Sequence, residues 1–389
     1  MKTYVVCIDG TWNNPNQTDK DPVEEKEKVT ETNVLRVYRF LTGIKNAVGA
    51  LEYGTILPLQ VSPAGNDAVG EAVYLNGVGS AGTRLKQLFE GATGTGTSER
   101  ILDAYRFLAT RHMAGDKIFI FGFSRGAFAA RSLAGFLQYV GLPQQPRILR
   151  DDEMTAAFNS YRFRGTGTKG KSVGRDVAVD FLGVWDTVGA LAFREINEFH
   201  LISPENVGQV AHALALDERR EQFQPSYWTA TGGNTIVDEV WFSGVHTNVG
   251  GGYFEEGLSN IALAWIVSKA VEAKLPSQPA YIQGWTAENA GGEQRDSYEE
   301  FQQQLGLVGR LATFFHVGEI HRTVLDGQKV HATVFERIAA FKDKAPSYLP
   351  AANLADGSPF PDGAEGLNPQ RIVETPDYLK DMMSPVNHA

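Results

Sequence analysis

Hydrophobic positions along the chain follow two patterns, short apolar runs of strand length and longer segments with a helical period. Apolar runs that predict strands lie at residues 4–8, 72–75, 118–123, 177–184 and 237–242. Segments with helical spacing predict helices at 32–41, 98–108, 127–140, 154–161 and 258–274. A stripe at Val207, Val210, Leu214 and Leu216 predicts another helix over residues 204–223. Strands that alternate with helices are typical of an α/β fold with a mostly parallel central sheet and helices on both faces.

Polar and glycine-rich stretches interrupt this alternation at three places. We expect a single α/β domain over residues 1–345, with insertions at about residues 42–72, 147–175 and 275–305. Residues 346–389 are rich in Pro, Asp and Gly and are expected to form an extended tail that packs on the domain. We find no internal repeat.

Composition and charge exclude several classes of function. The chain has 389 residues and a net charge of −10, which argues against a nucleic-acid partner because phosphate binding needs clustered Lys and Arg. Cys7 is the only cysteine, and no H-E-x-x-H or similar ligand spacing is present, so we expect neither a disulfide, a metal nor another cofactor. The N-terminal apolar run is too short for a signal peptide, and no stretch reaches the roughly twenty apolar residues of a membrane span, so we expect a protein that is cytoplasmic as synthesised.

The most informative motif is Gly122-Phe123-Ser124-Arg125-Gly126, which joins a predicted strand to a predicted helix. In this setting the G-x-S-x-G spacing is typical of a nucleophile elbow, where the two glycines leave room around the serine. Ser124 is therefore the candidate nucleophile, and the backbone N–H of Arg125 is a candidate oxyanion-hole donor. The alternative is an ordinary strand-to-helix turn that happens to contain a serine.

Two more polar side chains directly follow predicted strands. Asp186 comes after the apolar run at 177–184, and His246 comes after the run at 237–242. Because the carboxyl ends of parallel strands meet at one edge of a sheet, both are expected beside Ser124, in the nucleophile-acid-base order of α/β-hydrolases. Asp186 as a loop cap and His246 as a structural loop histidine are the alternatives. His321 is a rival base, because a hydrolase histidine can follow the last strand.

The loop after the first strand is the candidate source of a second oxyanion-hole donor. It begins Asp9-Gly10-Thr11-Trp12, and Gly10 and Thr11 are the candidate donors. Asp9 could equally cap the turn with its side chain. The side chains expected to line the pocket are those of Asp9, Trp12, Phe123 and Asn248, together with the backbone of Gly77.

Motifs over most of residues 1–275 resemble a known family. They are residues 9–13, 76–79, 115–131, 184–189, 213–220, 244–246, 249–253 and 258–265. In these segments the chain resembles a family of α/β hydrolases whose best-known members are phospholipase effectors of bacterial type VI secretion. The resemblance implies a Ser-Asp-His lipase or esterase that cleaves acyl esters, phospholipids among them, through Ser124, Asp186 and His246.

The same resemblance implies a setting for the protein. It implies a small-molecule or lipid ester substrate, peripheral contact with a membrane, export by a type VI secretion system, and a secretion-system or immunity partner. Two departures stand against it. Family members commonly have Asp where this chain has Asn248, and effectors often carry extra regions, whereas this chain is expected to be nearly all catalytic domain. A catalytically weak or inactive hydrolase-fold module that binds or regulates is the alternative function.

Overall fold

The protein is described by a computed structural model over residues 1–10, 13–20, 26–44, 51–60, 69–77, 95–163, 174–189, 203–229, 233–276, 288–308, 318–344 and 346–376. Its strands are β1 (Thr3–Ile8), β2 (Thr18–Lys20), β3 (Glu27–Val29), β4 (Thr55–Pro58), β5 (Gly70–Leu75), β6 (Lys117–Phe123), β7 (Val179–Trp185), β8 (Val207–Ala215), β9 (Ile236–Phe242), β10 (Thr323–Val324), β11 (Lys329–His331), β12 (Asn353–Leu354) and β13 (Ile372–Val373). Its helices are α1 (Asn33–Thr42), α3 (Thr95–Ala109), α4 (Arg125–Val140), α5 (Asp151–Arg162), α6 (His246–Gly250), α7 (Gly257–Glu272), α9 (Ser297–Val308) and α10 (Thr333–Phe341).

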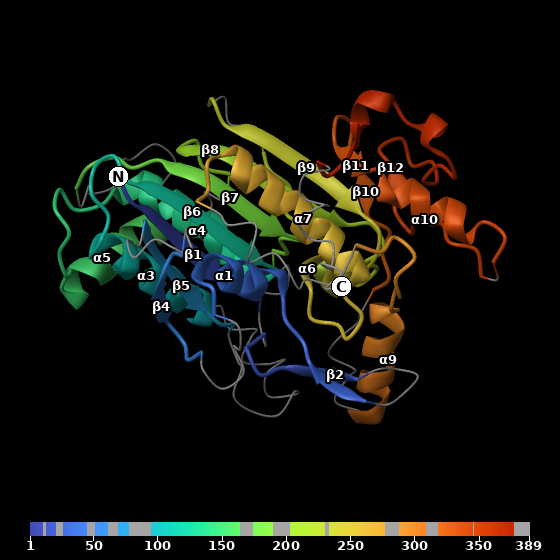
Figure 1. Cartoon of the computed structure of the whole chain (residues 1–389), viewed down its shortest axis with the longest axis horizontal. Coiled ribbons are helices and arrows are strands. Elements are labelled where there is room, and N and C mark those ends of the chain that lie inside the picture. The colour runs from blue at the N-terminus through green and yellow to red at the C-terminus, as the bar shows by residue number, and fades with distance from the viewer. Residues whose placement is uncertain are drawn as a thin grey trace, which may run out of the picture.

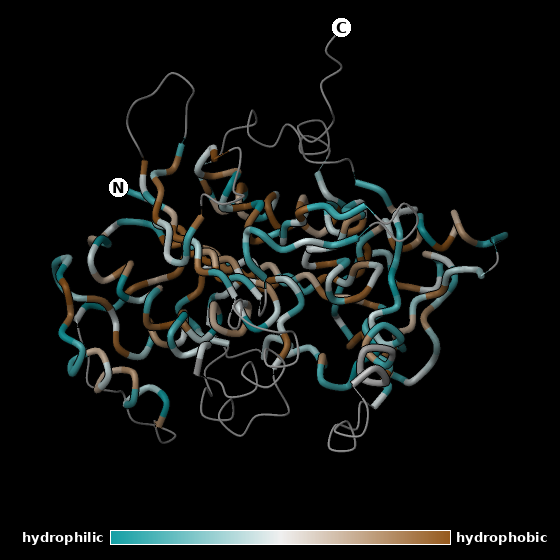
Figure 2. The backbone as a smooth tube through the Cα atoms, turned by 90° about the horizontal axis from the view of Figure 1, so that it is seen from below, coloured by the Kyte–Doolittle hydropathy of each residue, from teal (hydrophilic) through white to brown (hydrophobic). Residues whose placement is uncertain are grey.

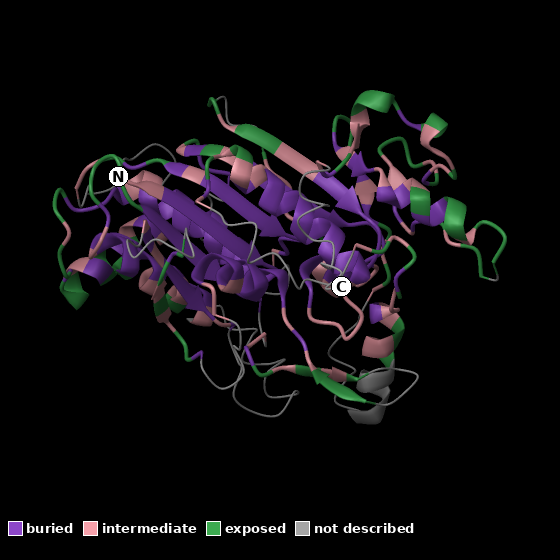
Figure 3. Ribbon diagram, viewed as in Figure 1, coloured by how far each residue is buried: buried purple, intermediate pink, exposed green. Residues whose placement is uncertain are grey.

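A nine-stranded sheet forms the centre of the structure (Figure 1). The strand order is β13-β11-β9-β8-β7-β6-β1-β5-β4, and neighbouring strands are parallel except at the β5-β4 edge. The strands in the middle of the sheet are almost entirely buried (Figure 3). Strands buried on both faces read as continuous apolar runs, which is the pattern of this sequence. The predicted mixed α/β architecture with a mostly parallel sheet is therefore confirmed.

Helices cover both faces of the sheet and divide its side chains into two cores. Alternate residues of β1 and β6 point to opposite faces, as the strand period requires. On one face Cys7 and Phe121 pack in the core that α1 and α7 complete. On the other face Val6 and Ile120 pack in the core that α3, α4 and α5 complete. The strongly hydrophobic stretches of the chain consequently run through its interior (Figure 2).

The C-terminal elements gather at one end of the sheet (Figure 1). β11 pairs with β9, and β13 then pairs with β11, so the end of the described chain forms the edge strand. A third core lies here, in which Leu214 and Trp241 of the sheet pack against Val334, Phe360 and Leu367. Residues on both sides of position 345 therefore contribute to one hydrophobic cluster.

One predicted element has the wrong type. Residues 207–215 form the central strand β8, whereas the sequence predicts a helix over 204–223. β8 lies between β7 and β9 and is buried from Val210 to Leu216. A strand buried on both faces has no period-two pattern, so its apolar residues can match a helical spacing by chance.

Three other segments contain more structure than the sequence predicts. The stretch at 42–72 includes the antiparallel edge strand β4, and the one at 275–305 contains the start of helix α9. The segment after Pro346 contains the short strands β12 and β13 in place of uninterrupted coil. Very short strands have too few residues to carry a readable pattern.

The third core predicts that the C-terminal segment unfolds together with the sheet. Phe360 is 5% exposed and stacks on Phe335, with ring centroids 6.0 Å apart. Phe360→Ala should therefore lower the free energy of unfolding by about 3 kcal/mol. Urea unfolding followed by tryptophan fluorescence should show a single transition. Ile148, which is 85% exposed, supplies the control Ile148→Ala, and equal effects of the two changes would contradict this packing.

Candidate active site

Four polar segments meet at the carboxyl edge of the sheet. Asp9 follows β1, Ser124 follows β6, Asp186 follows β7 and His246 follows β9. Since these strands are parallel, their carboxyl ends lie at the same edge, where ligands bind in open α/β sheets. The structure thus brings the predicted nucleophile, acid and base to one region.

Ser124 occupies a sharp turn between β6 and α4. Its φ is 58° and its ψ is −125°, a conformation that residues with a side chain rarely adopt. The turn is held because the Ser124 N–H donates to the Trp185 carbonyl oxygen at 3.0 Å and the Ser124 carbonyl oxygen accepts from the Phe128 N–H at 3.2 Å. A strained serine between a strand and a helix is typical of a nucleophile elbow.

The two glycines of the pentapeptide are required by close backbone contacts. A Cβ on Gly126 would lie 2.3 Å from the Ile8 carbonyl oxygen. A Cβ on Gly122 would lie 2.6 Å from the Gly126 carbonyl oxygen. A side chain at Gly126 would push the elbow away from the end of β1, and one at Gly122 would push the start of α4 away from β6, so both glycines have the steric reason that the motif predicts.

Asp186 and His246 form a buried hydrogen-bonded pair. His246 Nδ1 lies 2.6 Å from Asp186 Oδ2, and both side chains are almost fully buried. An ionised carboxylate only accepts hydrogen bonds, so Nδ1 carries the proton and Nε2 keeps its lone pair. The imidazole is therefore held in the tautomer that a general base needs.

The imidazole lies beside the elbow. Its ring centroid is 4.6 Å from that of Phe123, the residue before Ser124, and 4.9 Å from that of Phe223. Burial lowers the pKa of His246 below its ordinary value, although Asp186 works in the opposite direction. The ring is consequently a free base near neutral pH.

Sequence reasoning missed the strongest contact of Asp186, which is an ion pair with Arg322. Arg322 Nη1 lies 2.6 Å from Asp186 Oδ1, and Nη2 lies 2.9 Å from Oδ2. Burial alone would raise the pKa of Asp186, but the charges of Arg322 and His246 hold it well below its usual range. No motif surrounds Arg322 in the sequence, so no local signal could have found it.

The Asp217-Glu218-Arg219-Arg220 turn binds the backbone of His246 through Glu218. Glu218 is buried and accepts the backbone N–H of His246 at 3.2 Å and the hydroxyl of Ser297 at 3.0 Å. It also pairs with both Arg220 Nε and Nη2 at 2.8 Å. Burial opposes its charge, but Arg220 lowers the pKa of Glu218 to about 2. The turn is therefore ion-paired, and Glu218 within it is buried.

A second histidine orders the loop after Asp186. His212 of β8 is buried, and its Nε2 accepts the Thr187 N–H at 3.2 Å. Its Nδ1 then donates to Glu239 Oε1 at 2.9 Å. The sequence offers no sign of this role, because His212 lies within a segment that is predicted to be helical.

Asp9 organises the loop that was expected to supply an oxyanion donor. Its carboxylate accepts hydrogen bonds from the hydroxyls of Thr32 and Tyr74, each at 2.6 Å, and from the Gly10 N–H at 2.7 Å. A Cβ on Gly10 would lie 3.1 Å from Ser124 Cβ, so the loop reaches the nucleophile. The Gly10 N–H itself is already bonded to Asp9, and the other candidate donor, Thr11, lies outside the described residues, as does Trp12.

The remaining candidate residues lie in varied settings. Asn248 Oδ1 accepts the Val245 N–H at 3.2 Å and its Nδ2 donates to the Glu293 carbonyl oxygen at 3.1 Å, so the amide closes the first turn of α6. Gly77 donates its N–H to the Asn13 carbonyl oxygen. Arg125 begins α4 directly after Ser124. His321 is exposed, with Nδ1 2.7 Å from the Ala351 carbonyl oxygen.

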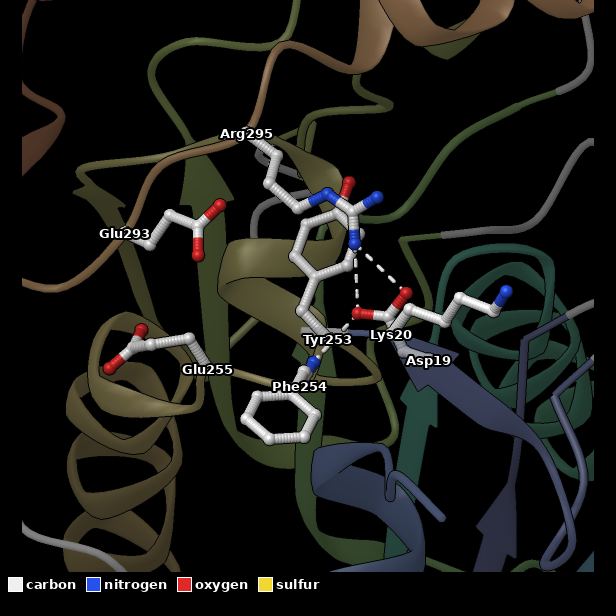
Figure 4. Close-up of a pocket in the computed structure, with 7 residues that line it drawn as sticks. All are labelled: Asp19, Lys20, Tyr253, Phe254, Glu255, Glu293 and Arg295. Atoms are coloured by element: carbon white, nitrogen blue, oxygen red, sulfur yellow. Dashed lines mark hydrogen bonds and ion pairs between the residues drawn. The ribbon is translucent and has the colours of Figure 1, made fainter. Parts of the chain in front are cut away.

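A shallow hollow lies between the β2-β3 ribbon and the loop after α6 (Figure 4). Its base is an ion pair in which Arg295 Nη1 lies 2.8 Å from Asp19 Oδ2. The Arg295 guanidinium also stacks over the Tyr253 ring at 4.6 Å. None of Ser124, Asp186 and His246 lines this hollow, so it is separate from the candidate active site.

Within the described ranges, no group of three or more His, Cys, Asp and Glu side chains could hold a metal ion. In the same part of the chain, each helix is too short or too polar to cross a bilayer.

Comparison with known proteins identifies a family and several proteins to which this chain is similar. The family model described as "T6SS, Phospholipase effector Tle1-like, catalytic domain" matches residues 2–269. An uncharacterized protein of Saccharomyces cerevisiae is 27% identical over 242 residues, which are 59% of this chain and 33% of that protein. A crystal structure of an uncharacterized protein from Pseudomonas aeruginosa aligns with 72% of this chain and 47% of that one, at 19% identity and a TM-score of 0.42. The chain thus spans less than half the length of either relative.

The burial of Asp9 predicts a pH dependence of stability. Desolvation raises the pKa of Asp9 to about 6, despite its hydrogen bonds. The unfolded carboxyl has a pKa of roughly 3.9, so between these values the native state binds a proton that the unfolded state does not, and stability falls as pH rises. The free energy of unfolding of the wild type minus that of Asp9→Asn should be about 2 kcal/mol larger at about pH 4 than at about pH 7. Urea titrations at both pH values test this, and a difference that does not change with pH would contradict it.

Proposed function

Because this chain belongs to the family of Tle1-like phospholipase effectors of type VI secretion, we propose that it is a serine hydrolase that cleaves acyl esters of phospholipids. The observation that carries the proposal is the buried Asp186-His246 pair beside the strained serine of the elbow. In this proposal Ser124 is the nucleophile, His246 the general base and acid, and Asp186 the residue that orients the imidazole.

We further propose that residues 1–345 form a single catalytic domain of the α/β-hydrolase fold, and that residues 346–389 pack on it. The parallel sheet, the elbow after β6 and the chain order Ser124, Asp186, His246 support this fold. The antiparallel edge strand β4 is compatible with it.

The reaction would proceed through an acyl-enzyme. Ser124 Oγ attacks the acyl carbon while its proton passes to His246 Nε2, and the carbonyl oxygen becomes an oxyanion. The C–O bond to the leaving alcohol then breaks, and that oxygen takes the proton from Nε2. Water attacks the acyl-enzyme, gives a proton to Nε2 and releases the carboxylic acid, after which Ser124 Oγ recovers its proton.

Backbone donors would stabilise the oxyanion. The Arg125 N–H at the start of α4 supplies one donor, because the N-terminus of a helix favours negative charge. The loop of Asp9, Gly10 and Thr11 would supply the other. Since the Gly10 N–H binds Asp9, the loop would use a neighbouring N–H or release this one when substrate binds.

Family membership also supports a biological setting. A phospholipid substrate requires contact with a membrane surface at the carboxyl edge of the sheet, and an effector would be exported by a type VI secretion system and met by an immunity partner. These activities and partners of the whole protein are proposals, since its relatives are more than twice as long as the aligned part.

The alternative of an inactive binding module rested on Asn248. The amide here donates a hydrogen bond to the Glu293 carbonyl oxygen, which an ionised Asp could not do. The substitution therefore has a structural reason in this chain, and His246 keeps hydrogen bonds to Asp186 and Glu218.

Covalent labelling tests the nucleophile. A fluorophosphonate probe should label the wild type and should not label Ser124→Ala, because only an activated serine attacks the phosphorus. Labelled peptides identified by mass spectrometry should contain Ser124. Ser132→Ala, at a buried serine of the same helix, is the control and should label normally. Absence of labelling in the folded wild type would refute the serine mechanism.

Separate replacement of the two histidines tests the base. His246→Ala should lower kcat for a short-chain ester on the order of 10⁴-fold or more, because members of a triad act as a unit. His321→Ala should leave kcat nearly unchanged, since His321 is exposed and bonds only a backbone carbonyl. If the two variants exchanged these phenotypes, the assignment of His246 would be wrong.

A further inference from the structure

The guanidinium of Arg322 is fixed from several directions. Besides both oxygens of Asp186, Nη1 donates to the Ala215 carbonyl oxygen at 2.7 Å and Nη2 to the Phe223 carbonyl oxygen at 2.5 Å. The side chains of Arg322 and Asp186 are both 0% exposed. A planar guanidinium held by four such contacts cannot turn, so it presents a rigid fork to the carboxylate.

Asp186 depends on outside contacts for its own position. Its φ is 39°, in the left-handed region that residues with a side chain seldom adopt. The Asp186 N–H donates to the Ala213 carbonyl oxygen at 2.7 Å, and Oδ1 accepts the Ala215 N–H at 3.0 Å. These bonds hold the backbone and one carboxylate oxygen. Arg322 binds both oxygens, so it fixes the plane of the carboxylate relative to His246.

The ion pair also reduces the net negative charge next to the imidazole of His246. An unpaired carboxylate strengthens the base by stabilising the imidazolium ion, whereas a carboxylate neutralised by an arginine does so less. The other charged and titratable groups around this pair are already engaged: Glu218 with Arg220, His212 with Glu239, and Arg131 with backbone carbonyls, while Tyr227 donates its hydroxyl to the Thr323 carbonyl oxygen. Arg322 is the cation in direct contact with Asp186.

Arg322 reaches the site from the C-terminal part of the chain, beyond the residues 2–269 that match the family model. The segment is docked next to the site by backbone hydrogen bonds, from the Ile320 N–H to the Arg219 carbonyl oxygen and from the Asn353 N–H to the Arg322 carbonyl oxygen, each at 2.8 Å. Asp217 in addition binds the Tyr348 hydroxyl at 2.9 Å and the Ala351 N–H at 3.0 Å. The C-terminal segment thus completes the surroundings of Asp186.

We propose that Arg322 is a positioning residue of the candidate triad, which holds the Asp186 carboxylate against His246 and limits the negative charge that the imidazole meets. This inference rests on the proposed serine-hydrolase function. It gives the C-terminal segment a role in the reaction, because Arg322 lies outside residues 2–269. His246 therefore stays neutral at a lower pH than the histidine of an Asp-His pair whose carboxylate has no arginine beside it.

The pH profile of Arg322→Gln tests the charge part of the proposal. The pH below which kcat/KM for a short-chain ester falls should rise by about 1 to 2 units. The reason is that Asp186, no longer paired with a cation, stabilises the imidazolium ion of His246 more strongly and so raises its pKa. The plateau of kcat should fall about 10- to 100-fold with little change in KM, because the carboxylate loses its orientation. An unmoved acidic limb in a folded variant would overturn the proposal.

Two further variants separate charge, geometry and stability. Arg322→Lys keeps the charge but loses the fork, so its limb should stay near the wild-type position while its kcat plateau falls. Arg337→Gln is the matched control, because Arg337 is a buried arginine of the same segment that binds the carbonyl oxygens of Ala290 and Gly292. It should lose stability without a shift of the limb. If Arg322→Gln does not fold, the Arg322→Lys variant tests the proposal instead. A kcat plateau of Arg322→Lys equal to that of the wild type would overturn the proposal.

A readout that needs no turnover separates this inference from the proposed function. The ring pKa of His246, measured by NMR of histidine-labelled protein, should rise in Arg322→Gln and not in Arg337→Gln. If wild-type turnover does not depend on Ser124 while the ring pKa moves as expected, the proposed function fails and the coupling stands. If turnover depends on Ser124 and the ring pKa does not move, the inference fails and the function stands.

Discussion

The structure depends on one buried carboxylate, that of Asp186, which connects three parts of the chain that are distant in sequence. It follows β7 in the centre of the sheet, bonds His246 of α6 and pairs with Arg322 of the C-terminal segment. A carboxylate without exposure to water carries a large desolvation penalty, and only full satisfaction of its hydrogen bonds offsets it. Removal of either partner would leave a buried charge uncompensated, so the pair and the cation hold the edge of the sheet together.

The same constraint recurs around the site. Glu218 is buried against Arg220 and the His246 backbone, Asp217 is buried against Gly244 and Tyr348, and Asp9 is buried against the hydroxyls of Thr32 and Tyr74 and the Gly10 N–H. These carboxylates respond differently: the pKa of Glu218 is lowered to about 2, whereas that of Asp9 is raised to about 6. The difference follows from the partner, because hydroxyl and amide donors compensate burial less than an arginine does. Burial and local charge therefore decide which groups along this edge are ionised.

Much of the fold and part of the candidate site could be predicted from the sequence. The strand, elbow and helix around Ser124 could be predicted because the two glycines and the apolar run that indicate them are neighbours in the sequence. Asp186 and His246 could be predicted because each lies close to the carboxyl end of a strand. Arg322 could not, since it lies 136 residues from Asp186 and sits in no motif. Strand β8 was predicted as a helix because burial on both faces removed the period that distinguishes the two. Long-range pairing and two-sided burial are properties of the folded chain, and local sequence does not report them.

We propose that Ser124 carries the acyl group during turnover, in a site completed by Asp186 and His246. Rapid quenching of the enzyme with a short-chain ester, followed by mass spectrometry of its peptides, is the direct test of this proposal. We expect the peptide containing Ser124 to gain the mass of the acyl group within the first turnover and to lose it as water completes the cycle. Steady turnover without any acyl adduct on Ser124, or with the adduct on another residue, would contradict it.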